Sequence, residues 1–184
     1  TSSTNTFNVN GLTIQANAVT GADEKLTITT DTDTQGMYDN IKEFITSYND
    51  LINELSSYYN ADSAKGYEPL TSEEKEAMSD SEVAEWEKKV KGALLRRDNT
   101  LGCIISAMST AMSSTVSVNG KNFGLANLGI KTFGYFTSSK NEKYALHIDG
   151  DSDDSSSSEN ADKLMAMLNS DPEAVNEIIK GVAS

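Results

Sequence analysis

The sequence predicts an α+β protein, a helical bundle with small flanking antiparallel β-sheets. Three observations support this fold class. In residues 36–60 apolar side chains recur every three or four positions, which indicates a long helix that packs lengthwise against other helices. Two Asn-Gly pairs, at 10–11 and 119–120, lie between short alternating segments and indicate tight β-hairpins. Capping boxes at 71–74 and 79–82 indicate the starts of further helices.

Two rows of apolar side chains run along the predicted helix 36–60. The first has the a/d spacing of a helix seam and consists of Tyr38, Ile41, Ile45, Tyr48, Ile52, Leu55 and Tyr59. The second recurs every seven residues and consists of Met37, Phe44, Leu51 and Tyr58. Together they form a face wider than a two-stranded coiled coil needs, so a bundle of three or more helices is predicted. We expect the opposite face to lie in water, with Asp39, Lys42, Glu43, Asn49, Asn53 and Glu54.

Phe44, Leu51 and Tyr58 are the candidate contact residues of this sequence. They widen the apolar face beyond what one partner helix covers, so we expect them inside the helix bundle or at a contact between subunits. A Leu51→Asp change should unfold the domain in the first case and only abolish assembly in the second.

Residues 1–35 are predicted to be a β-hairpin and strand segment that leads into the main domain. Alternating apolar residues on either side of Asn10 and Gly11 predict a hairpin with a type I′ turn. The alternation in KLTITT, residues 25–30, predicts a third strand. Asp33 or Thr34 is expected to cap the long helix.

Residues 36–184 are predicted to form the helical bundle, with a β-hairpin region at 116–149 and two short terminal helices at 159–169 and 172–182. The bundle is expected to consist of helices 36–60, 80–95 and 99–114. In the second of these, Trp86 is predicted to be a core anchor within an inner stripe of Val83, Trp86, Val90 and Leu94. In the third, capped by Asp98, Cys103 is predicted to be a buried small hydrophobe rather than a reactive thiol.

The C-terminal third is predicted to hold strands at 116–118, 130–136 and 144–148. His147 is expected to be a solvated or hydrogen-bonded surface residue and not a catalytic one. The segment 150–160, GDSDDSSSSEN, is predicted to be a flexible surface loop. Neither register of its acidic residues matches a calcium-binding EF-hand loop, so only weak, adventitious cation binding is expected there.

Composition excludes several classes of function. The chain has 184 residues, a net charge of −13 and a pI of about 4.4, which disfavours binding to nucleic acid or to anionic membranes. Since the sequence has one cysteine and one histidine and lacks phosphate-binding and nucleophile motifs, we expect no catalytic, cofactor or metal site. It begins with Thr1 and shows no signal peptide, so an internal segment of a longer chain is expected.

Five stretches then carry a resemblance to a known family. They are VNGLTI (9–14), ITTDTDTQGMYDNIKEFITSYNDLI (28–52), YEPLTSEEKEAMSDSEVAEWEKKVKGALLRRDNTL (67–101), LANLGIKT (125–132) and NSDPEAVNEII (169–179). In this order they resemble the C-terminal domain of the bacterial flagellar filament cap protein family, also called flagellar hook-associated protein 2. Residues 150–160 depart from the family pattern, in which the preceding strand passes directly into the next helix.

The resemblance implies a secreted structural protein without enzymatic activity, exported through the flagellar secretion channel and located outside the cell at the filament tip. It implies a leg-like helical domain, completed by coiled-coil segments from both ends of the full chain. The implied partners are further copies in a homo-oligomeric ring, flagellin, whose assembly the cap promotes, and the hook-filament junction proteins.

Two other classes of function stay open at this point. Members of the family are also implicated in cell adhesion, so an adhesin-type module that binds host surface glycans through its polar sheets and acidic loop is the alternative. A carbohydrate-active or metal-dependent enzyme would require a concave pocket with convergent carboxylates.

Overall fold

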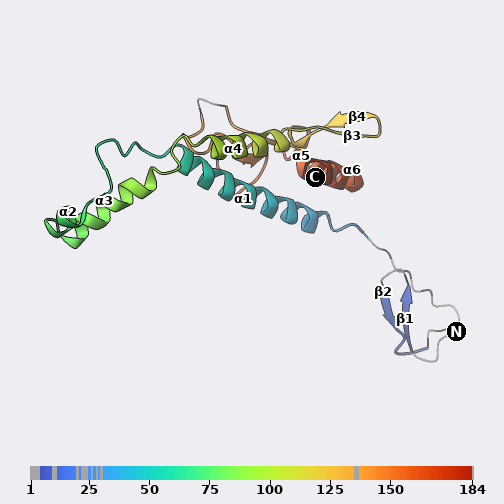
Figure 1. Cartoon of the computed structure of the whole chain (residues 1–184). Helices are drawn as coiled ribbons and strands as arrows, with labels where there is room; N and C mark the ends of the chain where they lie inside the picture. The colour runs from blue at the N-terminus through green and yellow to red at the C-terminus, as the bar shows by residue number, and fades with distance from the viewer. Residues whose placement is uncertain are drawn as a thin grey trace. The chain divides into compact units, whose positions relative to one another are not determined.

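A computed structural model describes residues 5–9, 12–19, 21, 25, 27, 29, 31–134 and 137–183. The chain divides into two compact units, Thr1–Thr32 and Asp33–Ser184. The first unit carries strands β1 and β2, and the second carries the remaining helices and strands (Figure 1).

The first unit contains the predicted hairpin. Strand β1 (Thr6–Val9) pairs antiparallel with β2 (Leu12–Gln15), and Val9 opposite Leu12 leaves a two-residue connection, as the Asn-Gly pair predicted. The conformation of that turn lies outside the described residues. Of the predicted third strand, residues 25, 27 and 29 are not in a strand, and residues 26, 28 and 30 lie outside the described part.

Helix α1 (Thr34–Tyr59) organises the second unit. The Asp33 carboxylate caps it by accepting a hydrogen bond of 2.9 Å from the Gly36 N–H, which confirms the first of the two predicted caps. Five members of the predicted seam are buried, and Leu55 and Tyr59 are half-buried against the same core. The buried residues of α1 are Tyr38, Ile41, Ile45, Tyr48, Ile52 and Ser56.

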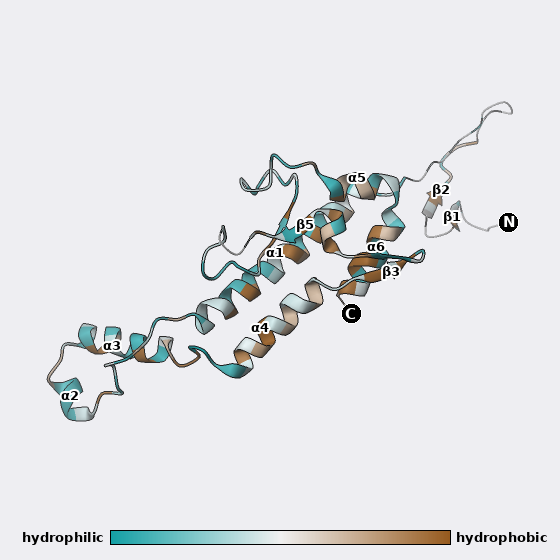
Figure 2. Cartoon of the chain, turned by 90° about the horizontal axis from the view of Figure 1, so that it is seen from above, coloured by the Kyte–Doolittle hydropathy of each residue, from teal (hydrophilic) through white to brown (hydrophobic). Residues whose placement is uncertain are grey.

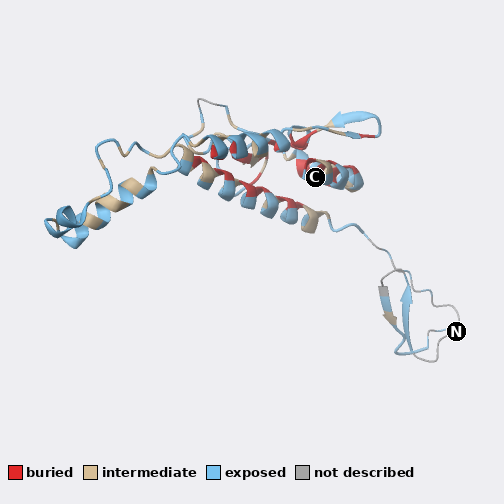
Figure 3. Cartoon of the chain, viewed as in Figure 1, coloured by how far each residue is buried: buried red, intermediate tan, exposed pale blue. Residues whose placement is uncertain are grey.

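The covering elements of α1 come from the second half of the chain. Helix α4 (Asn99–Met112), helix α5 (Lys163–Ser170) and strand β6 (Leu146–Ile148) pack on it, and α6 (Pro172–Val182) packs on α5. The most deeply buried apolar side chains are Ile52, Leu128, Ile130, Leu164, Leu168, Val175 and Ile178. In Figure 3 the buried residues accordingly gather on α1, α4, α5 and α6.

The predicted membership of the bundle was wrong in one helix. Helix α3 (Asp80–Gly92) has no buried residue, and it ends three residues before the predicted position 95. In Figures 1 and 2, α3 and α2 (Ser72–Glu76) lie beyond the ends of α1 and α4, and their ribbon is mostly hydrophilic. Because α3 carries so few apolar residues among its charges, it gains little from packing on the core, whereas the more apolar helices α5 and α6 take that place. We call residues 61–97 the arm.

Short antiparallel pairs complete the second unit. Strands β3 (Val116–Val118) and β4 (Lys121–Phe123) form the second predicted hairpin, and positive φ values of 51° at Asn119 and 75° at Gly120 fit a type I′ turn. A 3-10 helix, η1 (Leu125–Leu128), then leads into β5 (Ile130–Thr132), which pairs with β6. Strand β5 is shorter than the predicted 130–136, of which residues 135 and 136 lie outside the described part.

Both terminal helices are present. Helix α6 has the predicted bounds. The Asp171 side chain caps it, and Pro172 lies in its first turn. Helix α5 begins at Lys163, after the cap Asp162, rather than at 159. The residues before it belong to a loop whose contacts are given below.

Candidate assembly surface

The three candidate contact residues lie together on the exposed flank of α1. Phe44 is 37% exposed, Leu51 47% and Tyr58 43%, whereas Ile52, the neighbour of Leu51, is fully buried. The heptad spacing places them in one line along the helix, two turns apart. We call Phe44, Leu51 and Tyr58 the exposed row. The helices described here therefore pack on the first row of α1 and leave the exposed row accessible.

The exposed row meets an apolar groove at its Phe44 end. Met37, Ile41 and Phe44 of α1 face Ile179 of α6 across a hollow of about 250 Å³, which Asn40 and Asn176 also line. Met37 and Ile179 are half-buried against the core. The groove extends the row toward α6, so the accessible apolar surface reaches beyond α1.

The other flank of α1 corrects a prediction. Lys42 and Asn49 were expected in water, but both hold distant parts of the chain. The Asn49 side chain donates a hydrogen bond of 2.7 Å to the Leu146 carbonyl and accepts one of 2.7 Å from the Leu146 N–H. Lys42 forms ion pairs of 2.6 Å with Asp151 and with Asp153, and these hydrogen bonds raise the pKa of Lys42 above its ordinary value. This flank fastens α1 to β6 and to the loop that follows it.

The segment 150–160, here the acidic loop, is therefore more than the surface loop that its composition predicted. Asp151 and Ser157 within it are buried. Just before it, the buried Asp149 lies 3.0 Å from the Lys131 ammonium and accepts a hydrogen bond of 2.8 Å from Asn160. Asp151, Asp153 and Asp154 have partners within the protein, and the described part of the chain contains no group of three or more residues suited to hold a metal ion.

His147 is hydrogen-bonded, as predicted, and part-buried. It is stacked on Phe133 with ring centroids 3.7 Å apart, and its Nδ1 lies at hydrogen-bond distance from the Asp154 carboxylate. Burial alone would raise the pKa of Asp154, but hydrogen bonds from His147 and from the Ser156 N–H lower it below its ordinary value. The pair fastens the acidic loop to β6, and this role accounts for both side chains.

Trp86 is a local anchor of the arm and not the core anchor that was predicted. Its Nε1–H donates a hydrogen bond of 2.8 Å to the Glu68 carbonyl, and its ring meets Tyr67 edge-on at 4.6 Å between centroids. The Lys89 ammonium lies 4.5 Å from the centre of the same Tyr67 ring. These contacts join α3 to the segment before α2, so the arm is held by its own residues.

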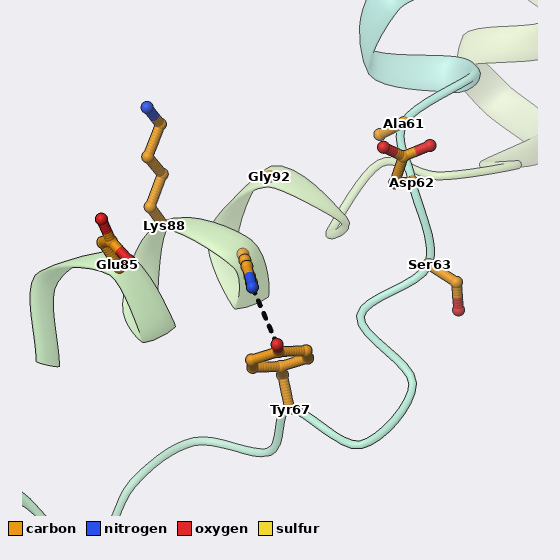
Figure 4. Close-up of a pocket in the computed structure, with 8 residues that line it drawn as sticks. Ala61, Asp62, Ser63, Tyr67, Glu85, Lys88 and Gly92 are labelled. Atoms are coloured by element: carbon orange, nitrogen blue, oxygen red, sulfur yellow. Dashed lines mark hydrogen bonds between the residues drawn. The ribbon is translucent and has the colours of Figure 1, made fainter. Parts of the chain in front are cut away.

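A hollow of about 620 Å³ lies beside this cluster (Figure 4). It is lined by charges of both signs, among them Asp62, Glu85 and Lys88. Figure 4 shows that Glu85 and Lys88 extend away from Tyr67, so the charged side chains do not converge on one point. Convergent groups are what acid–base chemistry requires. That the chain has no catalytic residue stays a prediction.

Cys103 is exposed, which corrects the prediction that it is buried. It lies two residues after the buried Leu101, about 200° around α4, so its side chain points away from the face that packs on α1. On this helix, α1 approaches closely at Gly102, where a Cβ would lie 3.1 Å from the Tyr59 ring.

Comparisons with known proteins agree on one family. The family model described as "Flagellar hook-associated protein 2 C-terminus" matches residues 1–184. A curated relative, "Flagellar hook-associated protein 2" of Halalkalibacterium halodurans, is 29% identical over 183 residues. The alignment covers 100% of this chain and 31% of the relative, so the chain spans about a third of that protein's length. No solved structure gives a significant match. No helix in the described part of the chain is long and apolar enough to cross a membrane.

Proposed function

This chain belongs to the flagellar hook-associated protein 2 C-terminus family, and on that premise we propose that it is a structural, non-enzymatic part of the cap at the tip of a bacterial flagellar filament. In this role it promotes the insertion of flagellin subunits below the cap. We further propose that residues 36–184 are one domain of a longer protein that is exported to the filament tip, and that residues 1–35 lead into this domain.

The observation that carries the proposal is the exposed row on α1. A helix whose inner seam is already buried still presents Phe44, Leu51 and Tyr58 at heptad spacing. Such spacing suits lengthwise packing against another helix, and apolar residues in contact at that spacing stabilise helix pairs. We assign the partner to helical segments of the same protein outside residues 1–184, since the relative is about three times as long as this chain.

Complementation tests the function. A strain that lacks its filament cap protein receives the full-length parent of this chain, its Leu51→Asp variant, or a Glu43→Ser variant. Glu43 is an exposed residue of the same helix outside the exposed row, so it is a matched control. We expect filaments to return with the parent and with Glu43→Ser, while cells with Leu51→Asp continue to release flagellin monomers.

Two results would contradict the proposal in different ways. If the parent restores no filaments although it is secreted, the cap role is wrong. If Leu51→Asp restores filaments as well as the parent does, the cap role stands and the assignment of the exposed row is wrong.

A further inference from the structure

A basic pocket lies where the end of α1, the start of α4 and the segment before β6 meet. Its volume is about 270 Å³, and we define it by Ser56, Arg97, Ser106, Lys140, Lys143 and Tyr144. Among the described residues that line it, three carry positive charge and none is acidic. This is unexpected in a chain with 28 acidic and 15 basic residues. The local potential is therefore opposite to that of the whole molecule.

Two of the basic residues also hold the end of α1. The Lys140 ammonium donates a hydrogen bond to the Asn60 carbonyl, and the backbone N–H of Arg97 donates one of 3.0 Å to the Tyr59 carbonyl. The Arg97 guanidinium lies 5.3 Å from the centre of the Tyr59 ring. Cations are favoured beside the carbonyls at a helix C-terminus. These contacts fix the positions of Arg97 and Lys140, so the pocket has a preformed shape.

This capping role leaves Arg97 and Lys140 without an acidic partner among the described residues, since no carboxylate there lies within ion-pair distance of either side chain. Arg97 also has a φ of 58°, a left-handed conformation that costs about 1 kcal/mol for a residue other than glycine. The structure holds this residue at the pocket against its backbone preference.

Ser56 supplies the independent observation. It is 1% exposed, it lines the pocket, and its hydroxyl finds no hydrogen-bond partner among the described residues. A buried polar group without a partner is destabilising, so native proteins usually satisfy such groups with protein, water or ligand. A change of the Ser56 χ1 rotamer turns the hydroxyl without moving the backbone. A group bound in the pocket could then accept its hydrogen bond.

We propose that the basic pocket binds a small oxyanion, either a phosphate or a carboxylate. Arg97 and Lys140 offer charge-assisted hydrogen bonds to its oxygen atoms, and the Ser56 hydroxyl offers a further donor from the wall. The inference does not depend on the proposed cap role, since it rests on the charge, shape and unsatisfied hydroxyl of this pocket alone.

Thermal unfolding of the 184-residue chain tests the proposal. Sodium phosphate and sodium acetate are titrated separately against sodium chloride of equal ionic strength. With a Kd of about 1 mM, about 10 mM of anion shifts the unfolding equilibrium roughly tenfold, which raises Tm by about 3–5 °C. A rise with phosphate alone identifies a phosphate site, and a rise with acetate alone or with both identifies a carboxylate-accepting site.

Two pairs of variants connect the effect to this pocket. Ser56→Ala should fold as the parent does and lose at least half of the anion-dependent rise, while Ser157→Ala should keep it. Ser157 is the control because its hydroxyl is also buried, but it lies in the acidic loop near Asp154 and does not line the basic pocket. Lys140→Gln should lose the rise, and Lys121→Gln, on the exposed strand β4, should keep it.

The proposal is overturned if neither anion raises Tm beyond sodium chloride. It is also overturned if Ser56→Ala and Lys140→Gln respond to the anion as the parent does, because the binding would then lie elsewhere. If Lys140→Gln lowers the basal Tm, the Ser56→Ala pair still decides the outcome, since removing an unpaired hydroxyl leaves the charges of the pocket in place.

Discussion

Two neighbouring residues of α1 should differ in how much their substitution destabilises the fold. Ile52 is fully buried and Leu51 is 47% exposed, although both are large aliphatic residues on the same helix turn. Ile52→Ala removes a core side chain and leaves a cavity, which costs about 2–5 kcal/mol. Leu51→Ser changes a surface position, for which roughly 0.5 kcal/mol or less is typical. For a chain of this size 1 kcal/mol corresponds to about 2–4 °C in Tm.

We therefore expect Ile52→Ala to lower the Tm of the 184-residue chain by at least about 4 °C, and Leu51→Ser by less than about 2 °C. Circular dichroism at 222 nm, recorded together with light scattering, measures unfolding and association on one sample. In the full-length parent, where we propose that the exposed row has its partner, Leu51→Ser should destabilise the protein or weaken its oligomer. A loss of stability in the 184-residue chain as large as that of Ile52→Ala would refute the assignment, because it would place Leu51 inside the fold.

Three further outcomes follow from single positions. The fluorescence of Trp86, the sole tryptophan, should change at a lower urea concentration than the far-UV circular dichroism, because the helices of the arm have no buried residue. Transitions at the same urea concentration would contradict this. Gly181→Ala should lower the free energy of unfolding by about 1–3 kcal/mol, since its Cβ would lie 2.5 Å from the Val116 side chain. Gly92→Ala places its Cβ in open space, so urea unfolding should detect no loss of stability in that variant. Burial raises the pKa of Tyr48 to about 12, so the unfolded state ionises first and roughly 3 kcal/mol of stability should be lost as the pH rises from 10 to 12. Urea titrations should show a smaller alkaline loss in Tyr48→Phe.

The elements of this fold that could be predicted are those with local signals. Helix α6 has its predicted bounds because Asp171 and Pro172 define its start and an amphipathic pattern defines its face. The seam of α1 was likewise predictable, since periodicity decides which residues share a face. The capping boxes of α2 and α3 are both formed, with Thr71 and Ser79 bonded to glutamates three residues on.

Periodicity does not say which element covers a helix face, and this accounts for the predictions that were wrong. Trp86 lies on a helical stripe, but the stripe of α3 is narrow among charges and finds its partner in Tyr67 rather than in the bundle. The sequence also did not allow the anchoring of the acidic loop to be predicted, because Lys42 lies 109 residues from Asp151 in the sequence. Long-range pairs of this kind depend on the complete fold.

The candidate surface was predictable as a set of residues but not as an exposed one. The heptad spacing of Phe44, Leu51 and Tyr58 fits equally a buried second row or a contact between chains. The exposed fractions show that the row is not a buried second row of this domain, since α4, α5 and β6 cover the seam and leave the row accessible. Only the position of elements elsewhere in the chain could decide this.

Helix α1 thus presents three faces. Its seam is buried by α4, α5 and β6, its polar flank is fastened by Lys42 and Asn49, and the elements described here leave its exposed row accessible. Since the first two faces already hold the helix in place, a partner on the third would bind an ordered surface and would not have to order α1 itself. The entropy of ordering is a main cost of association. A domain built in this way can fold before it assembles, and substitutions in the exposed row should therefore affect assembly without affecting the fold.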